Sequence, residues 1–205
     1  MIRPAPPDHL GDPVHSASVL NVANLLTVVR LLLVPVFAVA LFHDGGHNAT
    51  WRWIAFGIFA VASVTDLVDG ELARRRGLVT SFGKIADPIA DKALMGTALV
   101  GLSLLGDMPW WVTVVVLVRE VGVTLLRFWV IRHGVIPASR GGKAKTLLQA
   151  IAIGLYVLPL TGWLRTLSAV ILAAAVVLTV VTGIDYVARA LALRRTGRLA
   201  EQAGS

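Results

Sequence analysis

The chain has 205 residues, of which 56% are hydrophobic, and its formal net charge is +7. Soluble domains are about 45–50% apolar, so this composition and the long apolar runs predict an integral membrane protein with one compact domain. Lysine and arginine gather at the ends of the apolar runs rather than on one polar face, which excludes nucleic-acid binding, and the absence of cysteine excludes disulfides and thiol chemistry.

Residues 1–20 are polar and rich in proline, and we expect them to be disordered or to lie at the membrane surface. The stretch HSASVLNVAN, residues 15–24, is compatible with a short interfacial helix. We predict that the transmembrane domain covers residues 21–193 and that residues 194–205 form a basic cytoplasmic tail.

The rest of the chain is a series of apolar runs. Each run is close to the length of roughly 20 residues that a helix needs to cross the hydrocarbon layer. The sequence therefore predicts an all-α, polytopic membrane protein with six transmembrane helices. They are expected at residues 24–42, 51–74, 83–105, 109–132, 145–158 and 165–193.

Basic residues follow the second, fourth and sixth predicted helices, whereas the links HDGGHN and GDMP carry no lysine or arginine. Because basic residues mark the cytoplasmic side, both termini are predicted to be cytoplasmic. An even number of helices requires the same result. The basic residues concerned are Arg74, Arg75, Arg76, Lys84, Arg132, Arg140, Lys143, Lys145, Arg189, Arg194, Arg195 and Arg198.

Four aspartates lie at the predicted cytoplasmic ends of the second and third helices. Asp66 and Asp69 share one helix face by their i,i+3 spacing, and Asp87 and Asp91 share one by i,i+4 spacing. Four converging carboxylates repel one another, and a hard divalent cation with oxygen ligands, Mg²⁺ or Mn²⁺, removes that conflict. The set is large enough for two ions roughly 3.5–4 Å apart. The alternative is ordinary pairing of these aspartates with Arg74–Arg76.

Small residues accompany the aspartates. Gly70 and Ala73 lie on or beside the Asp66 face, and Gly83 lies one turn before Asp87. Missing side chains let a flat or bulky group approach the backbone, although small residues also serve close helix packing in membranes. Both interpretations stay open for Ala73, and a ligand is favoured for Gly70.

Eight of these positions, at fixed spacing, resemble the signature of the CDP-alcohol phosphatidyltransferase family. Its members are six-helix membrane enzymes, typically homodimers, that move a phosphatidyl group from a CDP-linked lipid to an alcohol and release CMP. The resemblance implies metal ligation by Asp66, Asp69, Asp87 and Asp91, a cytidine-diphosphate pocket lined by Gly70, Ala73, Arg74 and Gly83, and Asp91 as the general base.

The acceptor alcohol has to be predicted from other residues. Arginines and lysines around a polar cavity suit an acceptor that carries a phosphate. The candidates for binding it are Arg119, Arg127, Arg140, Lys143 and Lys145. For the last three, a purely topological role stays open.

The sequence around these residues is similar to the phosphatidylglycerophosphate synthase branch of the family, of actinobacterial type. That similarity implies CDP-diacylglycerol as the donor, sn-glycerol 3-phosphate as the acceptor, and a bacterial plasma membrane with the active site on its cytoplasmic side. Related enzymes that use inositol phosphate, phosphatidylglycerol or serine are the alternatives. A cation transporter is disfavoured because the acids stop in the inner third of the predicted bilayer.

Five polar residues of the first and fourth predicted helices have roles that stay open. Asn24, Thr27 and Arg30 share one helix face by i,i+3 spacing and are candidates for a wall of the nucleotide or phosphate site, but Arg30 is also able to snorkel to the interface. Arg119 and Glu120 are candidates for a structural pair, yet adjacent helix positions diverge, so we expect them not to share one face.

Overall fold

The computed structural model describes the backbone of residues 22–76, 81–130 and 140–203, and within these ranges every regular element is helical. The predicted all-α class is therefore confirmed. The helices are α1 (Val22–Phe42), α2 (Ala49–Arg76), α3 (Ser81–Leu104), α4 (Trp110–Val130), α5 (Arg140–Val157) and α6 (Gly162–Ala203), with a short 3-10 helix, η1 (His43–Gly46), between α1 and α2. Side chains are not described at residues 22–23, 67–76, 81–85, 87–88, 127–130, 140–144 and 193–203.

Two helices differ most from their predicted bounds. Helix α5 begins at Arg140 instead of Lys145, and α6 continues to Ala203 instead of ending near Leu193. The sequence RRTGRLAEQA after Leu193 lacks proline and is rich in strong helix formers, which explains why the helix continues. The predicted interfacial helix at residues 15–24 lies mostly outside the described residues, as does the segment 1–20.

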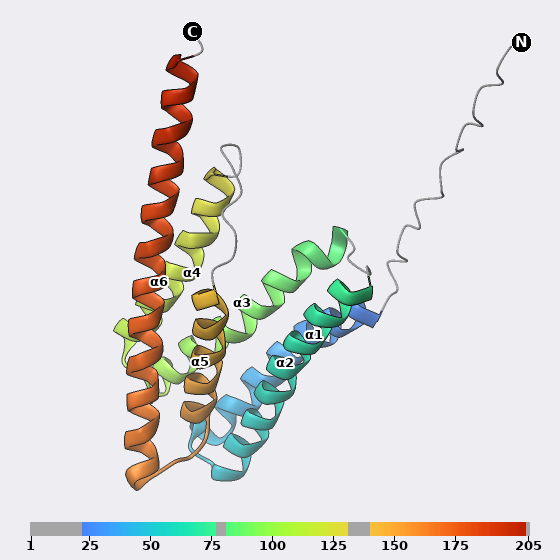
Figure 1. Cartoon of the computed structure of the whole chain (residues 1–205). Coiled ribbons are helices and arrows are strands. Elements are labelled where there is room, and N and C mark those ends of the chain that lie inside the picture. Colours follow the sequence, from blue (N-terminus) through green and yellow to red (C-terminus); the bar gives the residue numbers. More distant parts are fainter. Residues whose placement is uncertain (1–21, 77–80, 131–139, 204–205) are drawn as a thin grey trace, which may run out of the picture.

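Consecutive helices run in alternating directions, so the starts of α1, α3 and α5 point the same way as the ends of α2, α4 and α6 (Figure 1). Helix α1 packs against α2 and α3, and α6 packs against α4 and α5. Helix α5 also contacts α2 and α3 and thereby joins the two groups. This alternation brings the starts of three helices and the ends of the other three to one end of the bundle.

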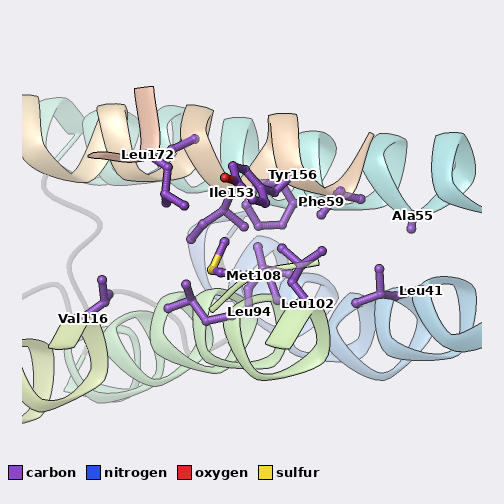
Figure 2. Close-up of a cluster of buried hydrophobic side chains, with 14 of the residues drawn as sticks. Leu41, Ala55, Phe59, Leu94, Leu102, Met108, Val116, Ile153, Tyr156 and Leu172 are labelled. Atoms are coloured by element: carbon purple, nitrogen blue, oxygen red, sulfur yellow. The ribbon is translucent and has the colours of Figure 1, made fainter. Parts of the chain in front are cut away.

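A continuous apolar core occupies the middle of the bundle. Figure 2 shows its side chains lying between the helices, with Met108 from the α3–α4 link among them. Glycine lets neighbours approach at one point of this core, because a Cβ on Gly154 of α5 would lie 3.3 Å from the ring of Phe56. The labelled core residues are Leu41, Ala55, Phe59, Leu94, Leu102, Met108, Val116, Ile153, Tyr156 and Leu172.

Two segments of the described chain are long and apolar enough to cross a membrane, judged by length and composition. They are Asn24–Gly46 and Gly162–Ala192, each with a mean hydropathy of 2.6. Both expose most of their surface, and leucine and valine side chains along α1 and α6 point away from the bundle. Exposed apolar faces of this size fit contact with lipid.

The link between α3 and α4 has a defined shape because α3 ends in a Schellman motif. Gly106 adopts φ +76°, and its N–H donates to the carbonyl of Ser103 at 3.2 Å, while the N–H of Asp107 donates to the carbonyl of Leu102 at 2.9 Å. Glycine is favoured here because only it adopts the left-handed conformation without strain. The motif fixes the direction of Asp107.

Asp107 forms the centre of a buried polar cluster at the end of the bundle opposite the aspartates, which we call the Arg52 cluster (Arg52, Asp107, Tyr156 and Arg165). The Arg52 guanidinium donates to the Asp107 carboxylate, and Arg165 donates to the Asp107 carbonyl at 2.8 Å. Arg165 also lies over the Tyr156 ring, 4.4 Å from its centroid. The cluster connects α2, α5 and α6 to the α3–α4 link.

The turn between α1 and α2 allows a test of local packing. Gly46 adopts φ +79°, and a Cβ placed on it would overlap the side chain of Leu105, whereas a Cβ on Gly45, at φ +70°, would meet nothing within 4 Å. We expect Gly45→Ala to lower the free energy of unfolding by about 1–2 kcal/mol through backbone strain alone. Gly46→Ala should lower it by about 1–3 kcal/mol more, because of overpacking. Thermal unfolding of both variants in detergent tests this, and equal losses would contradict it.

Candidate active site

The N-terminal half of α1 presents a buried polar face. Asn24, Thr27 and Arg30 are 4%, 1% and 1% exposed. They recur every three residues, so they lie along the same side of the helix. Their burial fits the predicted wall of a site better than snorkelling, because a snorkelling arginine keeps its guanidinium in water.

Arg30 joins α1 to the first of the four aspartates. Its Nη1 donates to Asp66 Oδ1 at 2.5 Å, and the Arg30 side chain is completely buried while that of Asp66 is 34% exposed. Asp91 of α3 interacts electrostatically with both Asp66 and Arg30. Three helices thus bring one cation and two of the predicted carboxylates into the same region, as their sequence spacing predicts.

Glu120 extends this region to α4 and α5. Its Oε1 accepts a hydrogen bond from Arg119 Nη1 at 2.9 Å and another from Lys145 Nζ. Glu120 also interacts electrostatically with Asp91. Arg119 and Glu120 therefore form a structural pair. We expected them not to share one helix face, and for their charged groups this expectation is wrong, because the long arginine side chain reaches round the helix to Glu120.

Arg119 extends further, to α6. Its Nη2 donates to Thr182 Oγ1 at 3.2 Å. A Cβ on Gly183 would lie only 3.1 Å from Arg119 Cγ, so the glycine makes room for the arginine stem. Sequence reasoning missed Thr182 and Gly183. The available signal was a threonine beside a glycine in the largely apolar middle of α6.

We call Arg30, Asp66, Asp91, Arg119, Glu120 and Lys145 the carboxylate cluster. Its carboxylates offer oxygen ligands only, which is the donor chemistry that Mg²⁺ and Mn²⁺ prefer. Among the side chains that the structure describes, no three acidic or histidine groups lie close enough to hold a metal ion. Asp69 and Asp87, the other two predicted ligands, belong to the residues whose side chains are not described. The carboxylate oxygens that the structure describes are of the kind that binds a divalent cation. The complete set of metal ligands stays a prediction.

Several other predicted site residues are placed only by their helices. Their positions on α2, α3, α4 and α5 agree with the end of the bundle at which the carboxylate cluster lies, but their side chains lie outside the described part. They are Gly70, Ala73, Arg74, Gly83, Arg127, Arg140 and Lys143.

The carboxylate cluster combines groups suited to an anionic substrate and to proton transfer. Lys145 and Arg119 supply positive charge, and Asp91 is able to accept a proton from a hydroxyl held near it. Burial within the bundle strengthens these electrostatic interactions relative to water. The arrangement is suited to the transfer of a charged group to an alcohol.

Comparisons with known proteins also indicate an enzyme that transfers a charged group to an alcohol. The profile of the CDP-alcohol phosphatidyltransferase family matches residues 20–181. The probable phosphatidylglycerophosphate synthase of Mycobacterium tuberculosis (strain ATCC 25618 / H37Rv) is 61% identical over 175 residues, which cover 85% of this chain and 84% of that protein.

Proteins named CDP-diacylglycerol--glycerol-3-phosphate 3-phosphatidyltransferase are similar as well. The one from Rickettsia felis is 36% identical over 81% of this chain and 93% of its own length. The one from Bacillus subtilis is 36% identical, with the same two coverages. On this evidence the chain belongs to the CDP-alcohol phosphatidyltransferase family.

Proposed function

We propose that the chain transfers the phosphatidyl group of CDP-diacylglycerol to sn-glycerol 3-phosphate, giving phosphatidylglycerol phosphate and CMP. The observation that carries the reaction is the convergence of Asp66, Asp91 and Glu120 with buried basic side chains at one end of the bundle. The names of the similar proteins from Mycobacterium and Bacillus support glycerol 3-phosphate as the acceptor.

The acceptor hydroxyl attacks the phosphatidyl phosphorus while the bond from that phosphorus to the CMP oxygen breaks. Asp91 accepts the proton of the hydroxyl. We favour direct displacement because none of the eight signature positions is a serine, histidine or cysteine that could form a covalent intermediate. Two divalent ions, Mg²⁺ or Mn²⁺, would neutralise the phosphate charge when bound. Their proposed ligands are Asp66, Asp69, Asp87 and Asp91.

The remaining residues bind the two substrates. Small and polar residues line the cytidine-diphosphate pocket, where a missing side chain leaves room for the nucleotide. Basic residues bind the phosphate of the acceptor through charge-assisted hydrogen bonds. The first group is Gly70, Ala73, Arg74, Gly83, Asn24 and Thr27, and the second is Arg119, Arg127, Arg140, Lys143 and Lys145.

We place all six helices across a bacterial plasma membrane, with both termini and the active site on the cytoplasmic side. The alternating helix directions and the basic residues at or near the C-terminal ends of α2, α4 and α6 support this topology. Exposed tryptophans near the opposite end, Trp53, Trp110, Trp111 and Trp163, fit the second interface. The resemblance to the family also favours a homodimer.

An acceptor panel tests the proposed function. Purified protein is given CDP-diacylglycerol and Mg²⁺ or Mn²⁺, with glycerol 3-phosphate, inositol phosphate, phosphatidylglycerol or serine in separate reactions. We expect metal-dependent CMP release and a new lipid with glycerol 3-phosphate alone. A lipid product with another acceptor and none with glycerol 3-phosphate would move the chain to a related enzyme, and no CMP release at all would favour transport.

A further inference from the structure

Glu120 is the one acidic partner that the described side chains give to both Arg119 and Lys145. Both cations donate to the same oxygen, Oε1, although they come from two helices. Arg119 is also fixed by Thr182 and by its contact with Gly183 on α6. The carboxylate of Glu120 therefore determines where these two charges lie relative to each other.

Burial makes this dependence strong for Lys145. Its side chain is 3% exposed, compared with 26% for Glu120. A buried ammonium group that loses its carboxylate partner becomes costly, so it has to move or give up its charge. Without Glu120, the Arg119 guanidinium loses one of the two hydrogen-bond acceptors that the described residues give it. Both changes reduce or displace positive charge.

Glu120 lies at the same end of the bundle as the proposed base Asp91, and the two carboxylates repel each other electrostatically. We infer that Glu120 is a positioning residue for the acceptor, which holds Lys145 and Arg119 where they bind the acceptor phosphate while its hydroxyl lies at Asp91. This inference rests on the proposed function and adds to it a residue that does not itself bind the phosphate. Glu120 acts on acceptor binding and leaves donor binding to other residues.

The test uses the full chain in detergent and separates the two substrates. Glu120→Gln should raise the KM for glycerol 3-phosphate by about tenfold, equivalent to about 1.4 kcal/mol, and change the KM for CDP-diacylglycerol less than about twofold. Glu120→Asp keeps the charge on a shorter side chain and should recover part of the loss. The matched control is Asp185→Asn, which removes the carboxylate of an exposed ion pair with Arg189 on α6 and should leave both KM values unchanged.

A double variant distinguishes positioning from a general loss of structure. In Lys145→Gln no buried ammonium remains to be held, so adding Glu120→Gln should raise the KM for glycerol 3-phosphate much less than it does in the unaltered chain. If Glu120→Gln alone folds poorly, Lys145→Gln is compared directly with the double variant, which has no unpaired lysine, and the two should have similar KM values for glycerol 3-phosphate.

Three outcomes would overturn the positioning role: an unchanged KM for glycerol 3-phosphate in folded Glu120→Gln, equal increases in both KM values, or fully additive effects with Lys145→Gln. The proposed function fails separately. If the proposed function is wrong, the unaltered chain itself gives no lipid product from glycerol 3-phosphate.

Discussion

Asp91→Asn is expected to abolish turnover while leaving the binding of CDP-diacylglycerol largely intact. The amide is nearly the same size as the carboxylate, but it is unable to accept the proton of the attacking hydroxyl. Loss of a general base typically lowers the rate by about 10²–10⁴-fold. CMP release measures the first effect, and a binding titration of CDP-diacylglycerol in the presence of Mn²⁺ measures the second.

The two measurements together decide the role of Asp91. If donor binding and its metal dependence disappear along with turnover, Asp91 acts mainly as a metal ligand and the base has to be sought elsewhere. Turnover close to that of the unaltered chain would remove Asp91 from the mechanism. Asp44→Asn is a suitable control, because Asp44 lies exposed in η1, at the other end of α1 from the carboxylate cluster.

Arg52→Met is expected to cause a large loss of stability. The Arg52 side chain is 6% exposed and donates to the Asp107 carboxylate and, at 3.4 Å, to the carbonyl of Tyr156. Removing one member of a buried ion pair typically costs about 3–5 kcal/mol, and because the remaining Asp107 side chain is 20% exposed, we expect the lower end of that range. Thermal unfolding in detergent should show a clear fall in Tm.

The double variant Arg52→Met/Asp107→Asn tests whether the cost arises from the unpaired charge. With both charges removed, most of the lost stability should return, since neutral replacement of a buried pair is often tolerated. A double variant as unstable as Arg52→Met would assign the effect to packing of the arginine stem instead. Arg189→Met, in an exposed i,i+4 pair with Asp185, should cost less than about 1 kcal/mol.

Local patterns in the sequence predicted the helices and the shared faces well. The apolar runs located all six helices, and the i,i+3 spacing of Asn24, Thr27 and Arg30 correctly placed them on one buried face. Such features depend on residues within one or two turns of each other. Helical geometry alone relates them, so a single sequence is sufficient.

Pairing between helices was not predictable in the same way. Arg52 lies 55 residues from Asp107, and Lys145 lies 25 from Glu120. Which charges meet depends on how the helices pack and on turns such as the glycine motif that ends α3. Lys145 was consequently predicted to bind the phosphate of the acceptor substrate, but its ion pair with Glu120 was not predicted. The roles of the individual site residues stay predictions.

The length of α6 has a consequence for the surroundings of the protein. Its 42 residues extend about 63 Å at about 1.5 Å per residue, roughly twice the 30 Å thickness of the hydrocarbon layer. Charged residues reappear in the helix from Asp185 and Arg189 onward, and the continuous helix carries on to Ala203 (Figure 1). In the proposed topology, this excess length would hold a fluorophore attached at the end of the helix in the aqueous phase, away from the membrane surface. The C-terminus is therefore a suitable place to measure distances to other membrane-bound proteins without labelling the bundle.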